Sequence, residues 1–247
     1  MIKTLITVPS YNRPYDIEKT TLYWLKKLPK RIEYKIFVRR EQARYYEQVS
    51  DNIYPISVAD YRETINVMSR YCREYKYDIM FRIDDDMSFK TKEYTKKIDS
   101  HKAFVQIYDH IVDAFKKNKK LGAVSIAKPM TFLHYKKPEL FQKNKIIFGN
   151  HICRANLHHL PIGIHMLDDI YMTLRTKQFG YEVWRYMGGY ENSVTHKNVG
   201  GLQSIKREHL TKATIKKLQD LFPQYDIQVG YFKNTNKVDI DIKKLKI

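Results

Sequence analysis

The amino-acid sequence predicts an α/β fold built on a single, Rossmann-like, mostly parallel sheet with helices on both faces. Short apolar and β-branched runs alternate with segments whose apolar residues recur every three to four positions. Strands that alternate with helices are joined by crossovers, which produce parallel strands covered on both faces. Two polar loops, 9–14 and 84–86, directly follow apolar runs. Because ligands in such sheets bind beyond the carboxyl ends of the strands, we expect a site at these loops.

Predicted strands and helices alternate most clearly in the first half of the chain. Residues 4–8 form a β-branched run that ends where Pro9 and Pro14 bracket a polar loop. Apolar residues over 104–115, in steps of three and one, predict the most strongly amphipathic helix. The other elements expected here are a helix over 17–28, strands over 34–38 and 54–58, a helix over 65–75, and strands over 77–83 and 121–127.

After residue 127 the periodic pattern loosens. A helix is expected over 166–179, with Gly180 as its C-cap, followed by a short strand at 183–184 and a last helix over 209–222. The sequence contains neither an internal repeat nor a low-complexity linker. We therefore expect one domain over residues 1–247, in which 1–127 form the first half and 128–247 the second half with a C-terminal tail.

The composition is strongly basic. The chain has 45 Lys and Arg against 27 Asp and Glu, a formal net charge of +18, and 43% of its 247 residues are hydrophobic. This composition excludes a disordered chain, and the charge favours a polyanionic or acidic partner unless it reflects generic lysine richness. Cys72 and Cys153 match no metal or redox spacing, and we find no bilayer-spanning run or signal peptide. We therefore expect a cytoplasmic protein.

Three consecutive carboxylates follow the strand expected at 77–83. Asp84, Asp85 and Asp86 would repel one another at a strand end unless a cation compensated them. Their hard oxygen ligands suit Mg²⁺ or Mn²⁺, and alternation along an extended segment would let Asp84 and Asp86 share one ligand while Asp85 faces elsewhere. The alternative is a solvated acidic turn or a helix N-cap. In a lysine-rich chain, directly after a buried strand, the pattern favours metal binding.

Two further features carry candidate chemistry. Asp168 and Asp169 lie at the start of the helix expected over 166–179 and either complement its dipole or supply a general base. His196 lies just before the pair Gly200 and Gly201, which indicates a close backbone approach, although a single histidine is only a weak metal signal.

The order of these pieces resembles the family 2-type glycosyltransferases of the GT-A fold over about residues 3–200. The segment Val8–Arg13 resembles their opening loop, Asp84–Asp86 their DxD motif, and residues 167–183 their "ED…L.lR…G…v" segment, with Asp168 in place of the usual glutamate. Asn66 and His196 also fall where many such enzymes carry an asparagine and a C-terminal histidine metal ligand.

The resemblance implies a UDP-sugar donor, a divalent ion on its diphosphate, and a nucleotide-sugar-binding half over residues 1–127 followed by an acceptor-binding half. Asp169 would be the base of an inverting enzyme, with Asp168 as the other possibility. Asp60 and Arg62 are additional donor candidates, or else simply the first turn of a helix. The implied donor contacts are Pro9, Tyr11, Arg13, Asp60, Arg62, Asn66, Asp84 and Asp85, and the implied metal ligands are Asp84, Asp86 and His196.

The chain resembles the TET-associated glycosyltransferases of phages in its net charge, its compact size and its Asp84-Asp85-Asp86 version of the DxD motif. This resemblance implies DNA with modified, hydroxylated bases as acceptor and the host cytoplasm as location. Lysines would neutralise phosphates while aromatic residues stack on an extruded base. The alternatives are a polysaccharide, lipid or protein acceptor, a non-catalytic nucleic-acid-binding protein, and a nucleotidyltransferase. The candidate nucleic-acid contacts are Lys128, Lys136, Lys137, Lys143 and Lys145.

Overall fold

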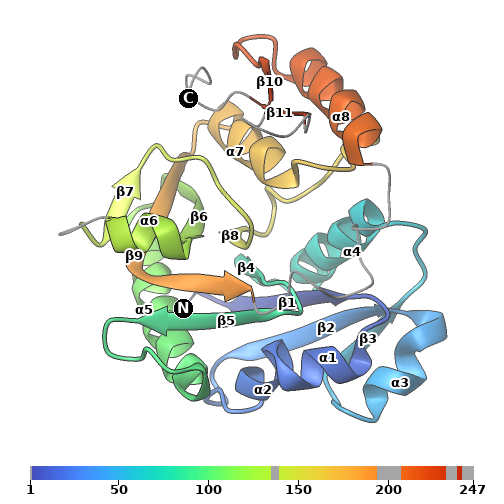
Figure 1. Ribbon diagram of the computed structural model, residues 1–247, viewed down its shortest axis with the longest axis vertical. Helices are drawn as coiled ribbons and strands as arrows, with labels where there is room; N and C mark the ends of the chain where they lie inside the picture. Colours follow the sequence, from blue (N-terminus) through green and yellow to red (C-terminus); the bar gives the residue numbers. More distant parts are fainter. Residues whose placement is uncertain (1, 135–138, 194–206, 232–237, 241–247) are drawn as a thin grey trace.

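The computed structural model describes residues 2–134, 139–193, 207–231 and 238–240 of the chain. Figure 1 shows one large sheet with helices packed against it and a small two-stranded sheet beside the last helix. The strands are β1 (Thr4–Ser10), β2 (Glu33–Arg39), β3 (Ile53–Ile56), β4 (Ile79–Arg82), β5 (Met87–Thr91), β6 (Leu121–Ala127), β7 (Phe141–Lys143), β8 (His151–Arg154), β9 (Glu182–Ser193), β10 (Val229–Tyr231) and β11 (Val238–Ile240). The helices are α1 (Pro14–Lys19), α2 (Thr21–Leu25), α3 (Ala43–Glu47), α4 (Tyr61–Glu74), α5 (Ser100–Lys117), α6 (Pro129–His134), α7 (Asp168–Gln178) and α8 (Arg207–Leu221).

The large sheet has nine strands in the order β3-β2-β1-β4-β8-β6-β9-β5, with β7 paired to β9. Strands β1 to β4 are mutually parallel, and β9 runs parallel to β6. The antiparallel members β5, β7 and β8 are those that the sequence pattern did not predict. The predicted α/β fold with a single, mostly parallel sheet is therefore confirmed.

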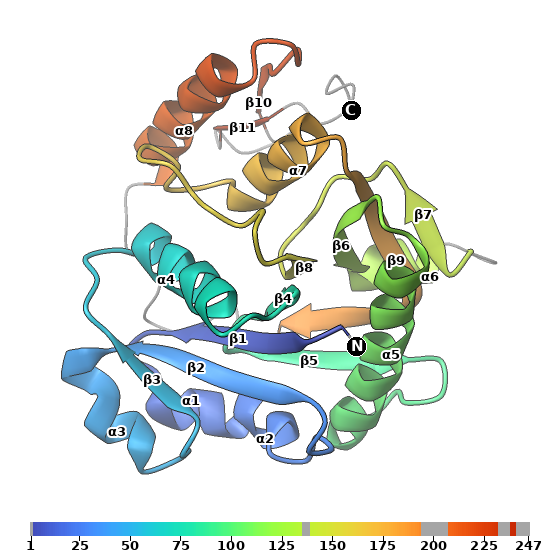
Figure 2. The same ribbon diagram turned by 180° about the vertical axis from the view of Figure 1, so that it is seen from behind.

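Helices cover both faces of this sheet, as Figure 2 shows from behind. Alternate residues of one strand enter different cores: Ile6 and Val8 pack with α1, α2 and α5, whereas Leu5 packs with α4, α7 and α8. The same alternation places Met80 of β4 in the second core, so its neighbour two positions on, Arg82, also belongs to that face. A charged residue thus lies on an otherwise apolar strand, on the side of α4 and α7.

The single helix expected over 17–28 is split into α1 and α2, which corrects that prediction. Thr20 lies between them with φ −119° and ψ −103°, outside the helical region. Its hydroxyl donates to the carbonyl of Asp16 (2.6 Å) and lies 2.7 Å from the carbonyl of Asp85. A tertiary contact to residues 84–86, here called the acidic loop, has therefore overridden the local helical periodicity.

Strand β9 is much longer than the two residues expected, because it pairs with strands in two different parts of the sheet. Its first half lies between β6 and β7, and its last residues pair with β5. At Gly189 a Cβ atom would lie 2.7 Å from the carbonyl oxygen of Lys90, so the strands can approach this closely only because glycine is present. The strand consequently delivers its C-terminal end, at Ser193, to the loop that follows β4.

In the described part of the chain, no helix has the length and apolar character needed to cross a bilayer.

Candidate active site

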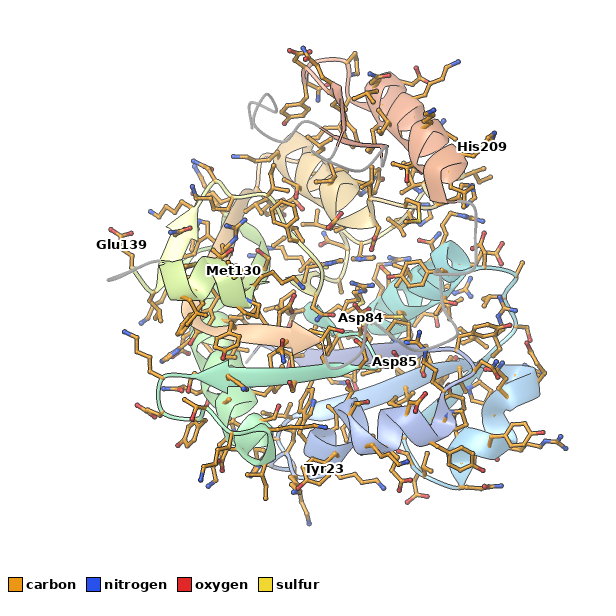
Figure 3. All side chains as sticks on the ribbon, viewed as in Figure 1. Tyr23, Asp84, Asp85, Met130, Glu139 and His209 are labelled. Carbon is orange, nitrogen blue, oxygen red and sulfur yellow. The ribbon has the colours of Figure 1, made fainter. Side chains whose placement is uncertain are left out.

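The two polar loops meet at one edge of the sheet. Strands β1 and β4 are parallel neighbours, with Thr7 opposite Arg82, so Ser10 and Asp84 to Asp86 leave the sheet side by side. Figure 3 shows Asp84 and Asp85 near the tip of β9. This edge is formed by the carboxyl ends of parallel strands, where α/β folds bind their ligands.

Asp85 is the buried member of the acidic loop and holds it against β1. Its carboxylate accepts a hydrogen bond from the Ser10 hydroxyl (2.6 Å) and forms an ion pair with Arg13 (3.2 Å). Burial raises the pKa of Asp85 to about 6, although Ser10 and Arg13 both favour the charged form. Asp85 and Arg13, both predicted to contact the donor, therefore first of all join the two loops to each other.

Asp84 faces the other side of the sheet and is partly exposed. Its carboxylate forms a 2.8 Å ion pair with Arg82, whose side chain is almost completely buried. Arg82 also donates to the hydroxyl of Tyr61 and to the carbonyl of Gly149 (3.2 Å). Burial alone would lower the pKa of Arg82, but the nearby Asp84, Tyr61 and Asp168 outweigh it and raise the pKa above its ordinary value. The guanidinium of Arg82 therefore places a permanent positive charge next to Asp84 in the acidic loop.

Asp86 turns toward β9, where its carboxylate accepts a hydrogen bond from the Ser193 hydroxyl (2.7 Å). The three carboxylates thus have three different sets of partners. No group of three His, Cys, Asp or Glu side chains able to hold a metal occurs within the described residues, and His196 lies outside them. Asp84 and Asp86 nevertheless offer hard oxygen ligands, which suit a Mg²⁺ or Mn²⁺ ion held mainly by substrate phosphates.

The second acidic pair lies across this edge, in the first turn of α7. Asp169 accepts hydrogen bonds from the backbone amides of Ile170 (2.8 Å) and Gly149 (3.4 Å). One carboxylate oxygen of Asp168 is buried and has no hydrogen-bond partner among the residues that the structure describes. Burial, followed by the charge of Asp168, raises the pKa of Asp169 to about 7. A carboxyl group with this pKa can accept and release a proton near neutral pH.

This raised pKa predicts how any reaction that uses Asp169 as its base depends on pH. The base must be ionised, so the initial rate at low substrate should rise about tenfold per pH unit below about 7 and level off above it. The measurement is the rate of nucleotide release between pH 5.5 and 9, at constant ionic strength and metal concentration. A rate that is flat from pH 6 to 8, in a protein that remains folded, would contradict this assignment.

The residues predicted for the nucleotide fall into two groups. Tyr11 follows β1 with 43% of its surface exposed, and the guanidinium of Arg39 lies 4.4 Å from the centre of its ring. Pro9 lies within β1 itself, one residue before Ser10. Tyr11 therefore lies on the same edge as the acidic loop with one face of its ring engaged by a cation.

The other predicted donor contacts carry local structural roles. Asp60 is the N-cap of α4 and accepts from the Glu63 amide (2.8 Å), which is the helix-turn alternative raised for it from the sequence. Arg62 forms an ion pair with Glu63 (3.3 Å). The amide group of Asn66 is hydrogen-bonded to the backbone of Leu160 through both its oxygen (2.7 Å) and its nitrogen (2.9 Å). A donor contact from Asn66 would have to break this bridge.

Of the lysines predicted for nucleic acid, the three that the structure describes do not gather at one place. Lys128 forms an ion pair with the fully buried Glu191. Lys143 lies on β7, beside the start of β9, with its ammonium 5.4 Å from the Trp184 ring, and Lys145 follows in the same segment. Since Asp86 contacts the opposite end of β9, these two lysines are remote from the acidic loop. Lys136 and Lys137 lie outside the described residues.

Several residues of this edge were not predicted from the sequence, among them Tyr61, Arg82, Asn150 and Glu191. A detectable signal existed for Arg82, because an arginine inside an apolar strand, two positions before Asp84, faces the same side as that acid. Glu191 is likewise an isolated acid in a lysine-rich chain. Asn150 and Tyr61 gave no signal, because their partners are distant in sequence.

The sequence matches no protein-family profile and no curated protein. Among solved structures, the chain is similar to S. aureus TarS (residues 1–349) in complex with UDP-GlcNAc, with a TM-score of 0.55 and 12% identity over 89% of this chain and 67% of that one. A mycobacterial protein matches with a TM-score of 0.53 and 9% identity over 97% and 83% of the two chains. The fold is of the GT-A type. At this identity the likeness establishes the fold alone.

Proposed function

We propose that this protein is a glycosyltransferase that moves a sugar from a UDP-sugar to an acceptor hydroxyl. The observation that carries the proposal is the meeting of the acidic loop with Asp168 and Asp169 at the carboxyl ends of β1 and β4. The crystal of TarS contains UDP-GlcNAc, which makes a UDP-sugar the first donor class to test on a chain of the same fold.

In this proposal the nucleotide lies along the end of β1. Tyr11 has an exposed ring on which a base can stack, and Arg13 supplies positive charge beside the loop. Asp84 and Asp86 would hold a Mg²⁺ or Mn²⁺ ion, which supplies charge compensation for the departing diphosphate when bound. Arg82 forms an ion pair with Asp84 and fixes the position of that carboxylate.

Asp169 is the proposed base. Its carboxylate is fixed by the amides of Ile170 and Gly149 and has a pKa suited to taking the proton of an incoming hydroxyl at neutral pH. Asp168, one of whose buried oxygens has no hydrogen-bond partner among the described residues, remains the alternative for this role. The proton leaves the acceptor oxygen as that oxygen bonds to the sugar carbon, and the bond from the sugar to the diphosphate breaks.

For the acceptor we propose DNA that carries hydroxylated bases, on the basis of the net charge of +18. The positions of Lys128 and Lys143 give this part no additional support, because one is paired with Glu191 and the other is remote from the acidic loop. A glycan, lipid or protein hydroxyl is the competing acceptor class.

The test has two stages. Thermal shift with a panel of UDP-sugars and Mn²⁺ should identify a stabilising donor, because a ligand that binds only the folded state raises the melting temperature. UDP release with that donor should then increase several-fold on addition of hydroxylated-base DNA but not of unmodified DNA. Stimulation by glycans alone would replace the DNA acceptor by a glycan, and DNA binding without any bound UDP-sugar would indicate a non-catalytic nucleic-acid-binding protein.

A further inference from the structure

The turn at Gly149 and Asn150 contacts both acidic centres of the proposed active site. The amide of Gly149 donates to Asp169 (3.4 Å), and its carbonyl accepts from Arg82 (3.2 Å). The side chain of Asn150, the next residue, accepts a hydrogen bond from the backbone amide of Asp84 (2.7 Å). Two consecutive residues thus connect the acidic loop after β4 to the first turn of α7.

Asn150 is completely buried, and both polar groups of its side chain are used. Its oxygen receives the Asp84 amide, and its nitrogen donates to Glu191 (2.8 Å). Glu191 is also fully buried and is paired with Lys128 through its other carboxylate oxygen. Because Glu191 accepts from Asn150 Nδ2, the amide has only one orientation that satisfies every partner, with its oxygen toward Asp84.

The Glu191–Lys128 ion pair also restricts the backbone conformation of this turn. Gly149 has φ +71°, and a Cβ atom there would contact the Lys128 ammonium and lie 2.9 Å from the Glu191 carboxylate. Only glycine combines this left-handed conformation with so close an approach of the ion pair. The Lys128–Glu191 ion pair therefore holds the turn on one side. On its other side the turn contacts Asp84, Arg82 and Asp169.

We propose that Asn150 is a positioning residue, held by the Glu191–Lys128 ion pair, that sets the place of Asp84 relative to Asp169. The inference rests on the proposed function, because it concerns the distance between Asp84, on the donor side of the site, and Asp169, the proposed base. Reaction rates are sensitive to such placement, and a displacement of about 1 Å can cost about 100-fold in rate. Asn150 is completely buried, so in this proposal it acts through Asp84 and not on the substrate.

The test compares Asn150→Ala with Asn118→Ala. Asn118 is a matched control because its amide also bridges a glutamate, Glu182 (3.0 Å), and a backbone amide, that of Lys120 (2.9 Å), but between α5 and β6. We expect Asn150→Ala to lower kcat about 10- to 100-fold with less than a threefold change in KM for the UDP-sugar, and Asn118→Ala to change kcat less than threefold.

Glu191→Gln adds a second variant that keeps the size of the side chain. It should act in the same direction as Asn150→Ala but more weakly, and the double variant should be no slower than Asn150→Ala alone, because both act through one hydrogen bond. Equal losses of kcat in Asn150→Ala and Asn118→Ala, or a loss confined to KM, would overturn the inference.

Hydrogen exchange separates this inference from the proposed function. Asn150→Ala should speed exchange of the Asp84 amide at least tenfold, while amides in the middle of β4 keep their protection. If the unmodified protein transfers no sugar, the proposed function fails while this result still decides whether Asn150 holds the loop. An unchanged Asp84 exchange rate would show that it does not.

Discussion

Asp169→Asn is expected to lower kcat for sugar transfer by about 10²- to 10⁴-fold, the range that a general base contributes. Asparagine keeps the size of the side chain, and its single oxygen can still accept the closer Ile170 amide (2.8 Å), so that only the longer contact with the Gly149 amide (3.4 Å), made by the other carboxylate oxygen, is lost. KM for the UDP-sugar should change little, because the base acts on the acceptor. The measurement is steady-state UDP release at pH 8 with saturating acceptor.

The stability of the same variant provides the control. The folded state raises the pKa of Asp169 from 3.8 to about 7, so the stabilisation associated with its protonated form is lost progressively as pH rises between these two values. Asparagine removes this loss, so the melting temperature of Asp169→Asn relative to the unmodified protein should increase from about pH 4 to about pH 7 and stay constant above it. If Asp169→Asn retains full turnover while Asp168→Asn abolishes it, Asp168 is the base.

Asp86→Asn is expected to lower kcat/KM by about 10²- to 10³-fold and to remove most of the stimulation by Mn²⁺, since a metal supplies several kcal/mol of transition-state stabilisation. The asparagine oxygen can still accept the Ser193 hydroxyl, so only the negative charge is lost. The measurement is UDP release as a function of Mn²⁺ concentration, with EDTA-treated enzyme as the zero point.

Ser193→Ala is the matched control for this variant. It removes the hydrogen bond to Asp86 but leaves the carboxylate in place, so we expect less than a fivefold loss and an unchanged Mn²⁺ dependence. Full Mn²⁺ stimulation in Asp86→Asn, or equal losses in the two variants, would exclude Asp86 as a metal ligand.

The parallel part of the sheet could be predicted from the sequence because each strand carries its own signal. β1, β4 and β6 are largely apolar and buried, β2 has the apolar run Ile36, Phe37 and Val38, and the buried residues of α5 recur with the helical period. The antiparallel strands β5, β7 and β8 are short or polar, and their pairing is decided by partners distant in sequence. Their existence could not be inferred from local pattern.

The same distinction between local sequence signals and contacts distant in sequence applies to the candidate site. Asp84 to Asp86 and Asp168 to Asp169 were found because clustered acids in a basic chain are conspicuous. The residues that position them, Arg82 and Asn150, act through contacts that only the fold creates. Asp60 and Asn66 were predicted to contact the donor, but in the fold Asp60 caps α4 and Asn66 bridges to the backbone of Leu160, a contact that the sequence did not predict.

The most direct test of the central claim is a crystal structure of the protein soaked with UDP and Mn²⁺. We predict the uracil against Tyr11, the diphosphate beside the acidic loop, and an anomalous manganese peak within about 2.5 Å of an Asp84 or Asp86 carboxylate oxygen. A UDP molecule bound away from the ends of β1 and β4, or no bound UDP at millimolar concentration, would contradict the proposed donor site.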